Sequence, residues 1–212
     1  MQNNSASSGF TAGTLVHTKD GLVPIEKIKV GDLVLSRSEH PEAGVELAFK
    51  RVLKVHVHDD LEIKQIGYKL GLDSMKERTY RLFVTPNHAF WEKSREWVAS
   101  WMLEGDWMGP SHLELFSRAT AYSHPQYVYK TSTAGVGWIT FAGFEGKGVL
   151  YDFSENKGLE TAYFDTKNWP IHEVIDGGDG DGYRYTATVY NLEVEDFHSY
   201  FVGEHGVLVK SA

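Results

Sequence analysis

Apolar and polar residues alternate over short stretches through most of the first 85 residues, which is the pattern of half-buried β-strands. Gly-Asp and Asp-Gly pairs, which favour turns, separate several of these stretches. Residues 23–28 depart from the alternation and predict a short helical turn that begins near Pro24. The predicted strands cover residues 14–18, 31–38, 48–60, 61–70 and 77–85, and we expect 48–60 to pair with 61–70 as a long hairpin.

The same alternation returns near the end of the chain. Residues 183–212 predict three strands, separated by turns at Glu195-Asp196 and at Gly203-Glu204. Residues between about 109 and 182 have no such regularity, although 133–155 could hold two or three strands and the glycine-rich segment 176–182 predicts a loop. The whole pattern therefore predicts an all-β fold with an insertion.

The composition fits a soluble globular domain. The chain has 212 residues, 42% of them hydrophobic and 24% charged, enough to bury one core with an elaboration. Its net charge of −8 and the absence of a basic cluster argue against a nucleic-acid partner. No apolar run reaches the length of about 20 residues that spans a bilayer, so we expect no membrane partner. The chain contains no cysteine, which excludes disulfides and thiolate metal sites.

Two segments repeat a common motif. "IEKIKVGDLVL" and "ASWMLEGDWMG" each place a Gly-Asp pair after an amphipathic turn, at Gly31–Asp32 and at Gly105–Asp106. The repeat occurs only twice, which excludes a solenoid and suggests two related halves.

Four stretches in order now suggest a family: "GFTAGTLVHTKDGLVPIEKIKVGDLVLSR", "FVTPNHAFW", "WVASWMLEGD" and "TVYNLEVEDFHSYFVGEHGVLV". Together they resemble the Hint domain, the Hedgehog/intein self-processing module, in the form carried by bacterial polymorphic toxins (pretoxin Hint). The resemblance covers residues 9–107 and 186–211, and it implies a pseudo-twofold β horseshoe. We therefore divide the chain as follows: a flexible linker at 1–8, the N-terminal Hint part at 9–108, an insertion of unknown role at 109–182, and the C-terminal Hint part at 183–212.

The resemblance also implies a chemistry. In the family, a Cys or Ser at the first residue attacks the preceding peptide carbonyl, and a second nucleophile cleaves the resulting thioester or ester. Thr85 and His88 match the family's Thr-x-x-His pair, which holds the scissile amide while the histidine protonates the departing nitrogen. The alternative is that Thr85 only caps the turn before Pro86 and that His88 is an ordinary residue at a strand edge.

The chain departs from the family at both junctions. Gly9 occupies the nucleophile position and has no attacking group, either because a cysteine was replaced or because the module has degenerated naturally. Ser8 lies one residue early and could attack only if the register slipped, so we expect no role for it. At the other end, Lys210 holds the place of the family's His and Ser211 that of its Asn. Because serine cannot form a succinimide, cleavage by Asn cyclisation is expected to be disabled.

Three further residues lie in the C-terminal part. His198 matches a family histidine near the C-terminal junction and could polarise the scissile carbonyl or relay a proton. The alternative is a turn histidine beside Asp196, and Asp196 itself could orient His198 or only close the turn. Asn191 stands where many inteins carry a catalytic Asp, so a carboxylate role there is in doubt.

Two clusters could bind metal. His56 and His58 share one strand face, but the sequence shows no third zinc ligand. Asp176, Asp179 and Asp181 are rich in oxygen ligands but lack the spacing and closing Glu of an EF-hand. We expect no metal and no cofactor.

The sequence thus predicts a self-processing Hint domain that is inactive as written. Its partners would be its own flanking segments, one of which could be a C-terminal toxin, within a larger bacterial protein that could be secreted. One alternative is a non-catalytic Hint-fold spacer or interaction module, with Gly9, Lys210 and Ser211 as native losses. A hydrolase or binding protein unrelated to Hint would require four ordered matches to arise by chance. The insertion lacks a homing-endonuclease motif, so we expect no DNA cutting.

Overall fold

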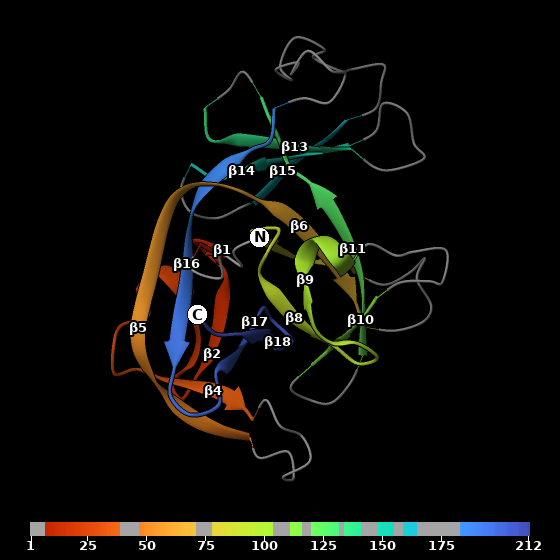
Figure 1. The fold of residues 1–212 in the computed structure, drawn as a ribbon. Helices are drawn as coiled ribbons and strands as arrows, with labels where there is room; N and C mark the ends of the chain where they lie inside the picture. The colour runs from red at the N-terminus through yellow and green to blue at the C-terminus, as the bar shows by residue number, and fades with distance from the viewer. Residues whose placement is uncertain are drawn as a thin grey trace, which may run out of the picture.

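The computed structural model describes nine stretches of the chain: residues 7–38, 47–70, 78–103, 111–115, 120–131, 134–140, 148–154, 159–164 and 183–212. They are nearly all β-structure, which confirms the predicted fold class (Figure 1). The only helical pieces among them are two short 3-10 turns, η1 (Ile25–Lys27) and η3 (Ser100–Leu103). No helix in these stretches is long and apolar enough to cross a membrane.

Fourteen strands form one large antiparallel sheet that curls on itself. Its path runs β10-β11-β6-β7-β1-β16-β5-β4-β2-β17-β18-β8-β9, and β3 pairs with β2 beside this path. These strands have the following bounds: β1 (Phe10–Thr11), β2 (Leu15–Thr18), β3 (Gly21–Pro24), β4 (Leu33–Arg37), β5 (Leu47–Glu62), β6 (Lys64–Lys69), β7 (Tyr80–Val84), β8 (Ala89–Glu92), β9 (Glu96–Ala99), β10 (Ser111–Glu114), β11 (Thr120–Tyr127), β16 (Thr186–Val194), β17 (Ser199–Val202) and β18 (Val207–Lys210).

The curl brings the two ends of this path together. Leu113 of β10 pairs with Glu92 of β8, so strands near opposite ends of the order become neighbours. The interior holds one apolar cluster contributed by most of the strands, with Phe10, Val84 and Tyr200 fully buried in it. This closure places the β7–β8 turn, β1 and the C-terminal strand β18 around one interior.

Most of the locally predicted elements are confirmed. The strand predictions near the N-terminus correspond to β2, β4 and β7, and the turn predicted at 23–28 is η1, which follows Pro24. The three strands predicted in 183–212 are β16, β17 and β18, with turns at 195–197 and 203–206. Gly203 in the second turn has a φ of +76°, a conformation that glycine adopts without steric cost.

The predicted hairpin of residues 48–60 with 61–70 is wrong. Both segments are strands, but β5 pairs with β4 and β16, whereas β6 pairs with β7 and β11. Only Ile63 separates β5 from β6, and one residue cannot reverse a chain when the tightest hairpins need two. Ile63 is instead buried at a corner, where its N–H donates to Tyr185 O at 3.2 Å. β5 and β16 form a long curved pair along one side of the molecule (Figure 1).

A second, four-stranded sheet lies beyond this corner (Figure 1). It has the order β12-β13-β14-β15, and its strands are β12 (Tyr129–Lys130), β13 (Val136–Thr140), β14 (Gly148–Asp152) and β15 (Leu159–Phe164). β13 and β14 account for two of the strands predicted in 133–155. Ile63, Phe83 and Val189 of the large sheet pack with Val149 and Tyr151 in a second apolar core.

The predicted insertion at 109–182 therefore contributes to both sheets. β10 and β11 extend the large sheet, whereas β12 to β15 form the small one. The division of the chain into a linker, two Hint parts and an insertion stays a prediction. Gly105–Asp106 and the loop at 176–182 lie outside the described residues, as do residues 1–6 of the predicted linker.

Replacing the corner residue tests how the two sheets are joined. We expect Ile63→Ala to lower the free energy of unfolding by about 2–5 kcal/mol, because it leaves a cavity in the second core. Val57→Ala is the control, since Val57 lies on β5 with 51% of its surface exposed and should cost no more than about 0.5 kcal/mol. Urea denaturation of both variants measures the difference, and equal values would contradict this packing.

Candidate functional site

The turn between β7 and β8 carries Thr85 and His88 and is tied down by hydrogen bonds. The His88 N–H donates to Thr85 O at 3.3 Å. Ser100, fully buried at the start of η3, donates its hydroxyl to Thr85 O and Pro86 O, each at 2.8 Å. The Ser100 N–H also donates to His88 O at 2.8 Å. The sequence contained no indication of Ser100, because its hydrogen-bond partners are some fifteen residues away. No local pattern distinguishes a buried serine that bonds a distant turn from any other serine.

Gly9 is held directly against this turn. The Gly9 N–H donates to Thr85 Oγ1 at 3.1 Å, and the Thr85 N–H donates to Gly9 O at 2.9 Å. The neighbouring residue Phe10 pairs with Val84 of β7 on one side and Tyr190 of β16 on the other. Thr85 therefore holds the backbone of Gly9, immediately before β1, through both its N–H and its C=O.

The position of Gly9 leaves no room for a side chain. A Cβ added to Gly9 would overlap the backbone carbonyl of Tyr190, with the carbon of that carbonyl 2.7 Å away. Real Cβ atoms essentially never approach backbone atoms this closely. A cysteine at residue 9 would require β1 or β16 to shift.

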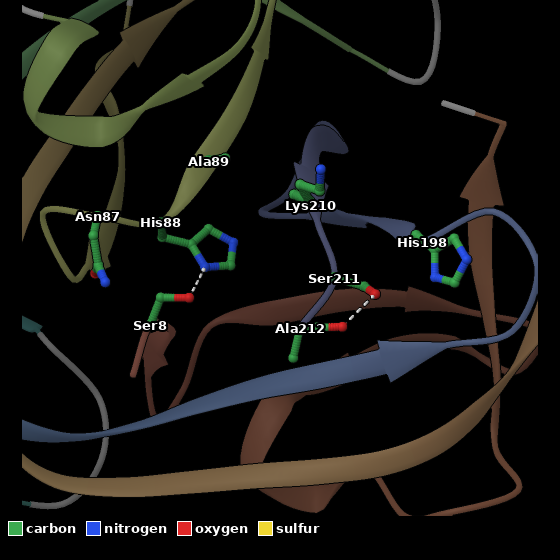
Figure 2. Close-up of a pocket in the computed structure, with 8 residues that line it drawn as sticks. All are labelled: Ser8, Asn87, His88, Ala89, His198, Lys210, Ser211 and Ala212. Carbon is green, nitrogen blue, oxygen red and sulfur yellow. Dashed lines mark hydrogen bonds between the residues drawn. The ribbon is translucent and has the colours of Figure 1, made fainter. Parts of the chain in front are cut away.

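His88 is buried and neutral. Its ring is only 1% exposed and makes edge contacts with the rings of Phe10 and Phe90, at centroid distances of 4.5 and 6.0 Å. Burial lowers the pKa of His88 to about 3, because the charged imidazolium would lose its hydration. His88 Nδ1 lies 3.4 Å from Ser8 Oγ (Figure 2). A neutral imidazole in this position can accept a proton from the hydroxyl.

Ser8 is held from a second side by Asn191. Asn191 Nδ2 donates to Ser8 Oγ at 3.3 Å. Asn191 Oδ1 accepts from the Tyr200 hydroxyl at 2.9 Å and from the Leu192 N–H at 2.8 Å, and these two donors fix which end of the amide faces Ser8. Burial raises the pKa of the Tyr200 phenol, so that this group remains a donor.

Asn87 contacts the residue before Ser8. Its Nδ2 donates to the backbone carbonyl of Ser7 at 3.4 Å. Three side chains thus contact this segment: Asn87 at the Ser7 carbonyl, and His88 and Asn191 at the Ser8 hydroxyl. Sequence reasoning gave Asn87 no role, since its function depends on where residue 7 enters the fold.

The end of the chain lies in the same pocket. The pocket is open, has a volume of about 400 Å³, and is lined by Ser8, Asn87, His88, Ala89, His198, Lys210, Ser211 and Ala212 (Figure 2). Ser211 is buried, with its N–H donating to His198 O at 2.9 Å, and the Ala212 N–H donates to Leu192 O at 2.9 Å. Lys210 is exposed, with Nζ 5.6 Å from the centre of the Trp97 ring. The structure therefore brings Ser211 and Lys210 to the pocket that holds His88.

His198 and Asp196 lie on the turn between β16 and β17, and both have a positive φ. The exposed His198 lines the pocket, on the side away from His88 (Figure 2). Asp196 is not among the lining residues, and its carboxylate forms an ion pair with Lys50 Nζ at 2.8 Å. Asn191, in contrast, is buried beside Ser8 as an amide donor.

The described residues offer no metal site. His56 and His58 stack on β5 with ring centroids 6.4 Å apart, and His56 Nε2 faces Glu193 Oε2 at 3.6 Å. In the described ranges no group of three or more His, Asp or Glu residues could hold a metal ion. Asp176, Asp179 and Asp181 lie outside those ranges.

A substitution at Gly9 tests the close approach to β16. We expect Gly9→Ala to lower the free energy of unfolding by about 1–3 kcal/mol, because the new Cβ overlaps the Tyr190 carbonyl. Alanine also restricts the unfolded chain, which on its own would stabilise the protein. Urea denaturation gives the net effect, and a variant as stable as the wild type or more stable would contradict the geometry.

The burial of His88 predicts a pH dependence of stability. Its pKa is about 3 in the folded protein against about 6.5 in the unfolded chain, so the unfolded chain binds more protons between these values. The contribution is fully present above about pH 6.5 and is lost as the pH falls toward 3, by about 1.4 kcal/mol for each pH unit. The free energy of unfolding of His88→Phe should fall less steeply over this window. Parallel pH profiles for the two proteins would contradict a buried neutral His88.

Comparison with known proteins relates part of the chain to one family. Residues 8–106 match the family model described as the Hint domain. No curated protein matches the chain by sequence.

Solved structures match over nearly the whole chain. The solution structure of a bacterial intein-like domain from Clostridium thermocellum shares 22% identity, covers 96% of this chain and 98% of its own, and has a TM-score of 0.57. A DnaB intein from Synechocystis sp. PCC 6803 shares 12% identity, with coverages of 97% and 99% and a TM-score of 0.53. The family match over residues 8–106 and the fold shared over nearly the whole chain support a Hint domain of the intein-like type.

Proposed function

We propose that this domain processes its own chain at the N-terminal junction, by an acyl shift that converts a backbone amide into an ester. Intein-like Hint domains act within their own flanking polypeptide, and the fold here is of that type. One observation carries the proposal: the segment entering β1 is gripped by Thr85 at Gly9 and lies against a buried, neutral His88. These groups bracket a single stretch of backbone, as an intramolecular reaction requires.

Each side chain has a role that fits its surroundings. Thr85 is a positioning residue that holds the backbone N–H and C=O of Gly9, one hydrogen bond to each. His88 moves the proton: it accepts one from the attacking hydroxyl and delivers it to the departing nitrogen. Its low pKa keeps it in the accepting form before the reaction.

The reaction proposed for this chain breaks a bond only at the N-terminal junction and none at the C-terminal one. Ser211 has no side-chain amide and cannot cyclise onto its own carbonyl. Its hydroxyl is instead 3.4 Å from both the Val194 nitrogen and the Ala212 carbonyl oxygen. His198 and Lys210 line the outer part of the pocket, where they could assist hydrolysis of the ester. The released partner would be a flanking segment, and the resemblance to toxin-associated Hint domains makes a toxin one candidate.

A non-catalytic spacer is the second candidate. It is favoured by Gly9, which has no attacking group and whose surroundings exclude any side chain. If residue 9 were the only possible nucleophile, the domain would be inactive as written. The two candidates therefore differ in whether the folded chain breaks a bond near residue 9.

Loss of an N-terminal tag separates the two candidates. A chain with short tags at both ends would be incubated with hydroxylamine, which cleaves esters, and followed by intact mass. We expect loss of the N-terminal tag only, reduced at least about 100-fold in His88→Ala.

The control for this experiment is His112→Ala, because His112 is an exposed histidine on β10 and lies outside the pocket lining. It should be processed like the wild type. If both tags remained on the folded wild-type chain over several days, the spacer would be the correct assignment.

A further inference from the structure

We propose that Ser8 is the nucleophile and that the bond it breaks is Ser7–Ser8, one residue upstream of the junction expected at Gly9. The inference rests on the proposed self-processing function and specifies its reacting atoms. From the sequence, Ser8 lies one residue before the family's attacking position, and no role was expected for it. In the structure it is the hydroxyl that faces His88 (Figure 2).

The hydrogen bonds around Ser8 determine where its proton points. Its Oγ accepts from Asn191 Nδ2, and Asn191 cannot reverse its amide without losing two donors to Oδ1. The hydroxyl proton is therefore left for His88 Nδ1, which can only accept it while the imidazole is neutral. An oxygen that accepts from an amide and donates to an imidazole is oriented as a nucleophile beside its base.

The carbonyl that Ser8 would attack also has a hydrogen-bond donor. Asn87 Nδ2 donates to Ser7 O at 3.4 Å, at the long end of hydrogen-bond distances. As the carbonyl becomes tetrahedral, negative charge develops on this oxygen and strengthens the contact with the amide donor. Nucleophile, base and oxyanion donor thus converge on one peptide bond, which is the bond between Ser7 and Ser8.

The absence of a side chain at Gly9 determines where Ser8 lies. Without a Cβ, residue 9 lies directly against the backbone of Tyr190, and its N–H and C=O are both bonded to Thr85. This double anchor fixes the chain immediately after Ser8, whose side chain is 7% exposed and faces the pocket. A side chain at residue 9 could not enter the same space without displacing β16.

The reaction balances without a cofactor. Ser8 Oγ forms a bond to the Ser7 carbonyl carbon while His88 takes the hydroxyl proton. The tetrahedral intermediate then collapses, the bond between that carbon and the Ser8 nitrogen breaks, and His88 returns the proton to the nitrogen. The product is an ester between Ser7 and Ser8 Oγ with a free amine on Ser8. Water or an added nucleophile then releases residues 1–7 and leaves a chain that starts at Ser8.

The test uses the full chain and reads the cleavage site by mass. We expect hydroxylamine to yield a chain that begins at Ser8, and no cleavage in Ser8→Ala. In Ser8→Cys the intermediate becomes a thioester, so that cleavage at the same bond should depend on added thiol. Ser154→Ala and Ser154→Cys are the matched controls, because Ser154 is exposed in the turn after β14 and does not line the pocket.

The outcomes separate this inference from the proposed function. Cleavage at Ser8–Gly9, or cleavage that persists in Ser8→Ala, would overturn the assignment of Ser8 but leave self-processing intact. No cleavage of wild-type or Ser8→Cys protein, each shown by circular dichroism to be folded, would overturn both. Cleavage after Ser7 that is lost in Ser8→Ala, and dependent on thiol in Ser8→Cys but not in Ser154→Cys, would establish Ser8 as the nucleophile.

Discussion

The structure of the site depends on the pair of hydrogen bonds between Gly9 and Thr85. They fix residue 9 at the end of β7 and let the short strand β1 insert between β7 and β16. Because Gly9 lacks a Cβ, β1 can lie against Tyr190 closely enough to make both contacts. The residues on either side of this anchor then have fixed places: Phe10 enters the core and packs on His88, while Ser8 enters the pocket. The curled sheet brings residues 210–212 to the same pocket, so that they and Ser8 line it together with His88.

The surroundings of His88 favour a neutral imidazole that takes up a proton only briefly over an imidazolium that keeps its charge. His88 is buried between aromatic rings, and its charged form is strongly disfavoured. Around Ser8 the polar partners are amides and a protonated phenol rather than carboxylates. A neutral base among neutral donors can take a proton briefly and return it, which suits a rearrangement that starts and ends uncharged at the reacting bond. Burying such polar groups is costly unless they are hydrogen-bonded, and the Tyr200–Asn191–Ser8 chain meets that requirement.

Local sequence patterns predicted the parts of the fold that depend on neighbouring residues. The alternation of β2, β4 and β7, the 3-10 turn after Pro24, and the three closing strands all follow from residues within a few positions of one another. The predicted β5–β6 hairpin was wrong because both segments have strand patterns, whereas their pairing depends on the corner at Ile63 and on other strands, one of them, β16, over a hundred residues away. Thr85 and His88 could be identified from the sequence because their spacing matches the Thr-x-x-His pair of the Hint family. Ser100, Asn87 and Tyr200 could not, since each acts through a contact with a residue that is not its neighbour in the sequence. The place of Ser8 likewise depends on the close approach of Gly9 to the Tyr190 backbone, which the sequence does not show.

The central claim is that the Ser7–Ser8 amide exchanges with an ester, and isotope labelling tests it most directly. The sequence contains a single Ser-Ser pair, so serine labelled with carbonyl ¹³C and with ¹⁵N marks this one peptide bond with both nuclei. NMR of the folded chain should show a fraction of molecules in which the Ser8 nitrogen is an amine and its coupling to a labelled carbonyl is lost, and this fraction should form far more slowly in His88→Ala. If the N-terminal segment were released with the labelled carbonyl and nitrogen still joined in one of the products, the broken bond would not be Ser7–Ser8 and Ser8 would not be the nucleophile.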